Sequence, residues 1–177
     1  MSQERSLSAA PIGVDRQYVT IGIASETIAI AVAQVQEVLD VQPFIRIPNM
    51  PAVVRGMIDV RRRAIPVFDL RLKFGLSATE ETPQTRIVVL DLIRDGALRR
   101  VGILADRVFE VTELDQTNVD PPPDIGMTWQ SQAVVGLGRR NGALVIVLDV
   151  NSLFDADDLP PALSAASSPA LLPRSGG

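Results

Sequence analysis

The sequence contains no cysteine and no histidine among its 177 residues. Without cysteine there is no disulfide framework and no thiolate metal site. Without histidine the chain lacks the commonest general base, the commonest zinc ligand and the phospho-acceptor of a histidine kinase. No segment reaches the roughly 18 uninterrupted apolar residues that a membrane span needs. We therefore expect a protein with no catalytic activity, no cofactor, no metal and no direct membrane insertion.

Aromatic residues and positive charge are also scarce. Aromatics make up 4% of the chain, and 17 basic against 21 acidic residues leave a formal net charge of −4. A nucleic-acid binder normally has a basic surplus and aromatic rings for base stacking, so we expect no nucleic-acid partner. An OB-like binder that uses the arginine run Arg61–Arg63 is the weaker alternative. Because the first ten residues lack the apolar core of a signal peptide, the expected location is cytoplasmic.

Composition also sets the limits of the ordered domain. The hydrophobic fraction of 46% is enough for one sizeable domain. Residues 1–16 are polar and are predicted to be a flexible leader. Residues 160–177 are rich in Pro, Ser and Gly and cannot build a packed element, so they are predicted to be a disordered tail. The domain is expected over residues 17–159.

Short β-rich runs dominate this region and predict an all-β fold with a few short helices. Two dipeptides, Asp95-Gly96 and Asn141-Gly142, are typical of hairpin turns. Many short strands joined by turns favour barrels or a sandwich over a parallel α/β sheet. The predicted strands are Tyr18–Ile23, Ile28–Val32, Gly56–Val60, Ala64–Phe68, Arg86–Ile93, Val101–Ala105, Val108–Thr112, Val134–Leu137 and Leu144–Leu148. The predicted helices are Asp69–Phe74, Val150–Phe154 and, more weakly, Pro51–Arg55.

The chain also repeats itself weakly. Both halves contain, in the same order, a hairpin, a V-x-E-V run and a G…D-[LV]…F pattern. The simplest interpretation is two similar small β-units side by side, each covering the apolar face of the other. The matched positions are Glu37 and Glu110 at an offset of 73, and Gly56 and Gly136, Asp69 and Asp149, and Phe74 and Phe154 at an offset of 80.

Several motifs resemble the signature of the CheW family. The stretch Gly56–Gly75 resembles its pattern G-x-I-N-L-R-G-x-I-x-P-[VI]-x-D-L-R-x-x-F. Val35–Val38 resembles V-Q-E-I, and Arg46–Pro51 resembles R-I-P-N-x-P. Val101–Asp106 resembles V-G-I-x-V-D. Further matches at 136–138 and 147–149 make the likeness collinear over about 18–154.

This resemblance implies a fold and a function. The fold would be two packed five-stranded SH3-like β-barrels. The function would be that of a non-catalytic chemotaxis adaptor, which couples the cytoplasmic tip of chemoreceptors to the regulatory domain of the histidine kinase CheA. An adaptor of a non-flagellar array, for pilus motility or development, is the alternative. An enzyme such as a hydrolase is a third possibility, but no nucleophile motif or phosphate loop supports it.

The resemblance also implies a receptor-binding groove. Its residues would be Val35, Glu37, Gly56, Asp59, Arg61 and Ile87. We expect Val35, Ile87 and Val101 to be half-buried strand residues. Glu37 and Arg61 are expected at the two ends of one polar rim, with receptor contact for both, whereas Glu110 is expected to face solvent.

Two residues depart from the family pattern. Asp59 stands where the pattern has Asn, and Arg62 stands where it has the turn Gly. Because glycine often supplies a positive φ in a tight turn, Arg62 indicates either a changed turn or a left-handed residue under mild strain. We expect Arg63 at the hairpin tip, and the run of three guanidinium groups suggests an unusually acidic partner surface.

Three remaining side chains admit more than one role. Asp69 and Asp149 could form a carboxylate pair for acid–base chemistry, but each precedes a predicted short helix. An Asp there is more simply an N-cap that accepts the first N–H groups of the helix. Trp129 stands alone in a Pro-rich connection and is predicted to be a loop anchor, although protein interfaces also favour Trp.

Overall fold

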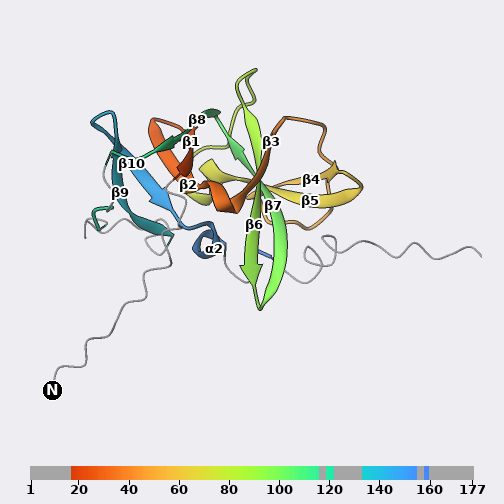
Figure 1. Ribbon diagram of the computed structural model, residues 1–177. Helices are drawn as coiled ribbons and strands as arrows, with labels where there is room; N and C mark the ends of the chain where they lie inside the picture. The colour runs from red at the N-terminus through yellow and green to blue at the C-terminus, as the bar shows by residue number, and fades with distance from the viewer. Residues whose placement is uncertain (1–16, 116–118, 122–132, 155–157, 160–177) are drawn as a thin grey trace, which may run out of the picture.

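The computed structural model describes residues 17–115, 119–121, 133–154 and 158–159 (Figure 1). The predictions for the leader 1–16, the tail 160–177 and Trp129 lie outside these ranges. In the described part, strands predominate, as predicted. The strands are β1 (Gln17–Ile23), β2 (Glu26–Ala31), β3 (Val35–Asp40), β4 (Val54–Val60), β5 (Arg63–Asp69), β6 (Arg86–Arg94), β7 (Ala97–Ala105), β8 (Arg107–Glu113), β9 (Val134–Arg140) and β10 (Ala143–Leu148). The helical segments are η1 (Val32–Gln34), α1 (Leu70–Lys73) and α2 (Val150–Leu153).

One predicted helix is wrong. Residues 51–53 form a turn instead, in which the Val54 amide donates to the Pro51 carbonyl oxygen at 2.9 Å. The chain then enters β4, where Val54 pairs with Phe68 of β5. The antiparallel ladder between β4 and β5 therefore overrides the local helical preference of this short segment.

The ten strands form two five-stranded sheets. Barrel A has the strand order β8-β1-β2-β10-β9, and barrel B has the matching order β3-β6-β7-β5-β4. Each barrel takes its central hairpin from one half of the chain and its other three strands from the other half. The two repeats are thus equivalent in topology, and the two similar β-units are present, but each barrel is built from strands of both repeats. The chain changes barrel between β2 and β3 and again between β7 and β8.

Each barrel closes through a short bridge beyond its ladders. In barrel B, Ile45 and Met57 exchange two backbone hydrogen bonds of 2.8 Å. In barrel A, Asp120 and Leu137 exchange two of 2.9 and 2.8 Å. The segments that follow the edge strands β3 and β8 thereby return to the opposite edges, β4 and β9, which gives the closed barrels expected from the sequence.

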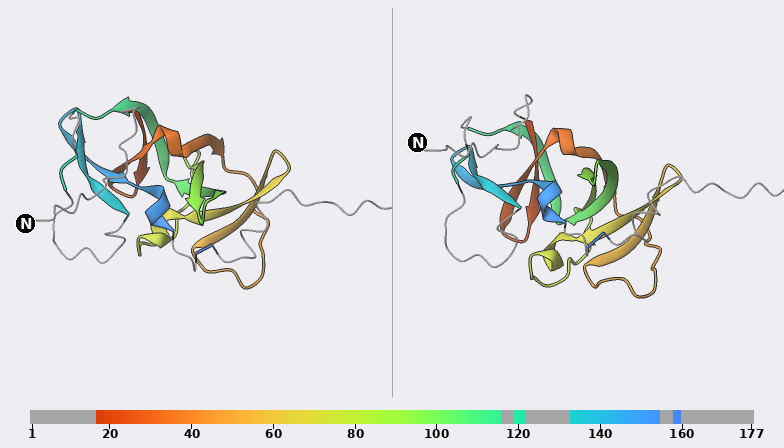
Figure 2. Two further views of the ribbon diagram at one scale, coloured as in Figure 1. Left: turned by 60° about the horizontal axis from the view of Figure 1, so that its bottom comes forward. Right: turned by 90° about the horizontal axis from the view of Figure 1, so that it is seen from below.

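The main hydrophobic core lies between the barrels. It joins buried side chains of both sheets with those of the short helices, and Phe68 meets Phe154 with ring centroids 4.8 Å apart. Figure 2 shows α2 in the middle of the molecule, between the two sheets. Smaller clusters fill the interior of barrel B, around Ile87 and Leu104, and of barrel A, around Val145 and Val147. Burial of apolar area is the dominant stabilising term, so each barrel depends on the other.

The predicted hairpin turns are confirmed. Asp95 and Gly96 have φ of 52° and 72°, and Asn141 and Gly142 have φ of 50° and 80°. Positive φ at both central residues is the mark of a type I′ turn, whose twist suits the flanking strands.

Candidate functional site

Gly56 allows a loop to lie directly against β4. Its φ is 148°, and a Cβ placed there would come within 2.8 Å of the Ile45 carbonyl oxygen and 2.9 Å of the Phe44 Cβ. Any side chain would therefore push away the segment that bridges to Met57. Gly136 has the same role in barrel A, where a Cβ would lie 2.2 Å from a backbone oxygen. Gly56 shapes the site by close packing.

Glu37 and Arg61 are in direct contact across the seam of barrel B. The Arg61 Nη2 lies 3.4 Å from the Glu37 Oε2, with side-chain exposures of 77% and 21%. The expectation that they stand at two ends of a rim is therefore wrong. Glu37 lies on β3 and Arg61 follows β4, the two edge strands of this sheet. The ion pair forms only because the barrel closes.

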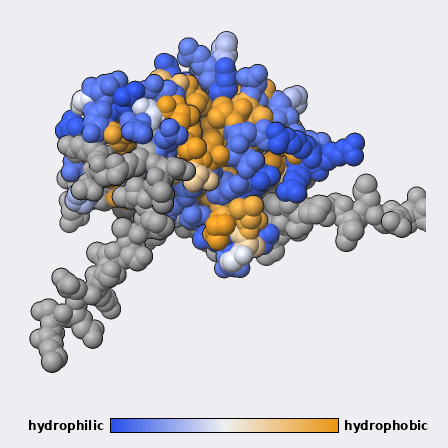
Figure 3. Space-filling view, viewed as in Figure 1, coloured by the Kyte–Doolittle hydropathy of each residue, from blue (hydrophilic) through white to orange (hydrophobic). Residues whose placement is uncertain are grey.

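Arg61 and Arg62 form the tip of the β4–β5 hairpin. Their φ values are 53° and 65°, so of the two alternatives for Arg62 the structure shows the left-handed residue. The expectation that Arg63 lies at the tip is wrong, because Arg63 opens β5 and pairs with Val60. All three arginines are exposed. In Figures 1 and 2 this hairpin end extends away from the body, and in Figure 3 it is strongly hydrophilic.

The other three predicted site residues occupy different depths. Asp59 is exposed on β4, and Val35 is half-buried against the core between the barrels. Ile87 has no exposed surface and belongs to the interior of barrel B. The expectation of half-burial is wrong for Ile87 and also for Val101, which is 1% exposed, because both strands lie inside the sheet. Ile87 thus lies in the interior of barrel B and not on its surface.

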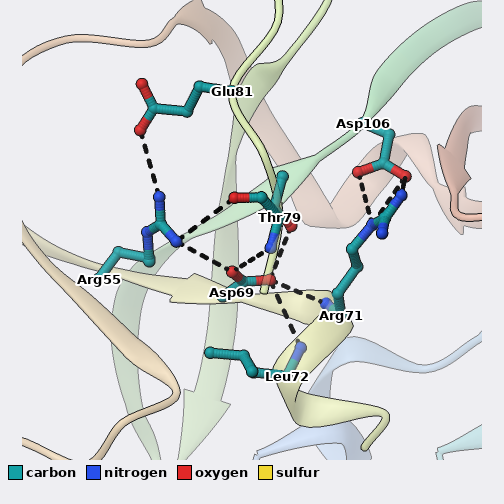
Figure 4. Close-up of polar contacts among 7 residues, drawn as sticks. All are labelled: Arg55, Asp69, Arg71, Leu72, Thr79, Glu81 and Asp106. Atoms are coloured by element: carbon teal, nitrogen blue, oxygen red, sulfur yellow. Dashed lines mark hydrogen bonds and ion pairs between the residues drawn. The ribbon is translucent and has the colours of Figure 1, made fainter. Parts of the chain in front are cut away.

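Asp69 is a fully buried hub and not half of a catalytic pair (Figure 4). Its carboxylate accepts the amides of Arg71 at 3.1 Å and Leu72 at 3.4 Å, which confirms the predicted N-cap of α1. It also accepts the amide of Thr79 at 2.8 Å and the hydroxyl of Thr79 at 2.7 Å. The Arg55 guanidinium lies 3.4 Å away and also reaches Glu81. Asp69 therefore pins the loop after α1.

Asp149 caps α2 in the same way. Its carboxylate accepts the Asn151 amide at 3.0 Å and the Ser152 hydroxyl at 2.9 Å, so the cap prediction is confirmed here too. The Gln34 side-chain amide donates to it at 3.2 Å. Since Gln34 lies in η1, on the first crossover between barrels, this cap also ties the crossover to α2.

The second crossover is held by Asp106, a residue whose partners the sequence did not reveal. The Arg71 guanidinium donates to both oxygens of Asp106, at 2.8 to 3.0 Å, and this hydrogen bonding raises the pKa of Arg71. The Ala24 amide donates to the same carboxylate at 2.6 Å. Arg71 is 35 positions from Asp106 in the sequence, and Ala24 is 82 positions from it. No local pattern predicts such pairs.

Barrel A carries a counterpart of the Glu37–Arg61 pair. The Arg140 Nε lies 3.2 Å from the Glu110 Oε1, and it again links the two edge strands, here β8 and β9. Glu110 is 50% exposed, which confirms the prediction that it faces solvent. The two barrels thus present similar polar seams.

Two further observations limit what the site can be. In the described ranges, no three acidic side chains gather to hold a metal ion. None of the helices described here is long and apolar enough to cross a membrane.

The fold and the site together define a class of protein. Two interlocked β-barrels each carry an ion pair between their edge strands, while the Asp69 and Asp149 carboxylates serve as helix caps. This is the arrangement of a β-barrel interaction module.

The comparisons with known proteins identify the family. A family model described as "CheW-like domain" matches residues 17–158. A "Chemotaxis protein CheW" of Treponema pallidum is 31% identical over 147 residues, covering 81% of this chain and 84% of that protein. Its namesake in Helicobacter pylori is 30% identical over 141 residues, covering 80% and 82%. This chain therefore belongs to the CheW family.

A solved structure supports the fold. The crystal structure of the "scaffolding protein TtCheW" from Thermoanaerobacter tengcongensis superimposes with a TM-score of 0.69 at 26% identity. The superposition covers 80% of this chain and 89% of that one. The fold class predicted from the sequence is confirmed.

Proposed function

We propose that this chain couples the cytoplasmic tip of chemoreceptors to the regulatory domain of the histidine kinase CheA. The chain is a non-catalytic chemotaxis scaffold, as its family and its structural neighbour indicate. The relatives are named as chemotaxis proteins, so an adaptor of a non-flagellar array is not favoured. Association with receptor arrays from the cytoplasm is part of the same proposal.

The receptor would dock on the Glu37–Arg61 seam of barrel B. The observation that carries this assignment is the exposed ion pair, formed by residues that match the family motifs. Arg61 is 77% exposed, and within the described residues its ion pair is the 3.4 Å contact with Glu37, so its guanidinium can engage a second acidic group. Arginine suits such contact because its planar fork is weakly hydrated. Val35 and Asp59 would border the contact, while Gly56 and Ile87 would shape it from beneath.

The kinase would use a separate surface, at an exposed barrel edge. β8 is an edge strand of barrel A, and its outward side chains Phe109 and Val111 are 50% and 58% exposed. Exposed apolar side chains on a strand edge are typical of a surface that another chain covers.

The variant Arg61→Glu tests the receptor assignment. It places a second carboxylate beside Glu37, so it should weaken binding to a soluble receptor-tip fragment by well over tenfold, in keeping with the roughly 2–5 kcal/mol that a desolvated charge can contribute. The melting curve should barely change, because exposed ion pairs contribute little to stability.

Arg140→Glu is the matched control, because it makes the same change at the counterpart seam of barrel A. It should leave receptor binding near that of the wild type. Titrations with the receptor fragment and with the kinase regulatory domain, at low and moderate salt, separate the two surfaces. Wild-type receptor binding by Arg61→Glu would show that this seam is not the receptor site.

A further inference from the structure

The backbone amides of the β9–β10 turn bind a carboxylate. At Asn141 and Gly142, two consecutive amides point to the same side, and one carboxylate accepts both. The Asp115 Oδ1 accepts the Asn141 amide at 3.0 Å, and the Oδ2 accepts the Gly142 amide at 2.9 Å. These two hydrogen bonds lower the pKa of Asp115, and the one from the Gly142 amide has the larger effect. Successive amides arranged in this way form an anion-binding concavity.

The β4–β5 turn has the same geometry at the equivalent place. Arg61 and Arg62 precede Asn141 and Gly142 by 80 positions, the offset of the repeat. Their φ values of 53° and 65° compare with 50° and 80°. The flanking pairs also correspond, since Val60 faces Arg63 where Arg140 faces Ala143. The Arg61 and Arg62 amides should therefore also point to one side.

This first turn lacks the carboxylate of the second. Asp115 lies two residues beyond the end of β8, and the residue two beyond the end of β3 is the neutral Gln42. Across the described residues, no acceptor is hydrogen-bonded to the Arg61 or Arg62 amide, although the equivalent amides of the other turn are both satisfied. Among the described residues, nothing competes with solvent or with an external ligand for this amide pair.

The surroundings of the first turn favour a negative ligand. Arg61 pairs with Glu37 at 3.4 Å, while Arg62 and Arg63 form no ion pair within the described part of the chain. Two guanidinium groups thus flank the two open amides without a counter-charge. Charge-assisted hydrogen bonds from arginine and from backbone amides to a carboxylate are among the strongest in proteins.

We propose that the Arg61–Arg62 turn is a carboxylate-binding site. Its ligand is an Asp or Glu side chain of the protein that docks on this seam, which takes the place that Asp115 takes within the chain in barrel A. The nature of that protein, a chemoreceptor tip, rests on the proposed function. Arg62 makes the site selective for acidic partners, because a glycine there would keep the amides and lose the charge.

Amide NMR with sodium acetate as the probe tests the site without any partner. At constant ionic strength set with sodium chloride, acetate should move the Arg61 and Arg62 amide protons downfield along a saturating curve. The Asn141 and Gly142 amides are the internal control and should not move, because Asp115 occupies them. Equal movement of all four, or movement of the arginine amides no larger than at other exposed amides, would refute the site.

Asp115→Ala provides a second control within the same molecule. It should open the β9–β10 turn, so that acetate now shifts the Asn141 and Gly142 amides as well. If this variant fails to fold, the site is tested by the wild type alone, through the difference in acetate-induced shift between the Arg61 and Arg62 amides and the Asn141 and Gly142 amides.

The same spectra, recorded with the soluble receptor-tip fragment, separate this inference from the proposed function. Binding of the fragment with downfield shifts of the Arg61 and Arg62 amides would support both. Binding without those shifts would overturn the carboxylate site and leave the coupling function standing. Failure of the fragment to bind, with a normal response to acetate, would overturn the receptor assignment and leave the carboxylate site standing.

Discussion

Arg61 and Arg62 hold a left-handed backbone that glycine adopts at little cost. For a residue with a Cβ, this region costs about 1–2 kcal/mol. Arg62 occupies it with φ of 65°, and no ion pair to another described residue offsets the strain. Strain of this kind tends to persist at sites where the side chain has a function.

The variant Arg62→Gly should therefore be more stable than the wild type. We expect the free energy of unfolding to rise by about 1 kcal/mol, which is a Tm increase of about 2–4 °C for a domain of this size. Thermal and urea unfolding give the measurement. Gly142→Arg is the mirror control, and it should be destabilised by a similar amount. A lower Tm for Arg62→Gly would show that the arginine stabilises the turn.

The two helix caps should differ in their importance. Asp69 is fully buried and satisfies three amides and a hydroxyl, whereas Asp149 is partly exposed. Asp69→Ala would leave buried donors without partners, so we expect a loss of more than about 3 kcal/mol. Asp149→Ala should cost about 1 kcal/mol, the usual value for a cap. Urea unfolding of both variants provides the comparison, and equal losses would contradict the role of Asp69 as a hub.

At the scale of elements, the β9–β10 hairpin should make stability depend on pH. Its turn amides keep the pKa of Asp115 below the ordinary value, so the ionised form is bound better in the folded chain. This stabilisation is present above the unfolded-chain pKa of about 3.9 and is lost as pH falls through the lower folded pKa.

The measurement is the Tm difference between the wild type and Asp115→Asn. The wild type should melt higher at pH 6, and the gap should narrow below about pH 4. A gap that stays constant from neutral to strongly acidic pH would mean that the charge of Asp115 does not stabilise the turn.

Sequence patterns predicted the strands and turns well, because those signals are local. Asp95-Gly96 and Asn141-Gly142 need positive φ, and both turns form where they stand. The segment Pro51–Arg55 was predicted wrongly because its conformation depends on pairing with β5. Ile87 was placed at half-depth because the family resemblance assigned it to the wall of a groove. The continuous apolar run Ile87–Leu90 is instead the pattern of a strand that is buried on both faces.

At the scale of the whole molecule, the exchange of hairpins was the feature that the sequence could not show. The repeat indicated two equivalent units, but either connection, within a repeat or between repeats, satisfies the same pattern. The contacts that settle it, such as Asp106 with Arg71 and Ala24, join distant positions. In the candidate site, the Glu37–Arg61 contact likewise depends on barrel closure, although the motif had already singled out both residues.

The exchange predicts that neither half of the chain folds alone. A cut between Ser77 and Ala78, in an exposed part of the loop after α1, gives fragments 1–77 and 78–177. Each fragment holds strands of both barrels, so each lacks the core between them. Separately they should show no cooperative unfolding, and mixed at equal concentration they should recover it. Calorimetry provides the measurement, and a cooperative transition in either isolated fragment would contradict the prediction.

Lys73 is the only lysine of the chain. Its side chain is 7% exposed, forms an ion pair with Asp158, and lies with its Nζ 5.8 Å from the Phe154 ring centroid. Amine-reactive cross-linkers and labels will therefore find almost no side-chain target, whereas the guanidinium groups of the docking seam are untouched by that chemistry. A bait coupled to a resin through its α-amino group would keep this surface intact. Covalent mapping of its contacts calls for reagents directed at carboxylates.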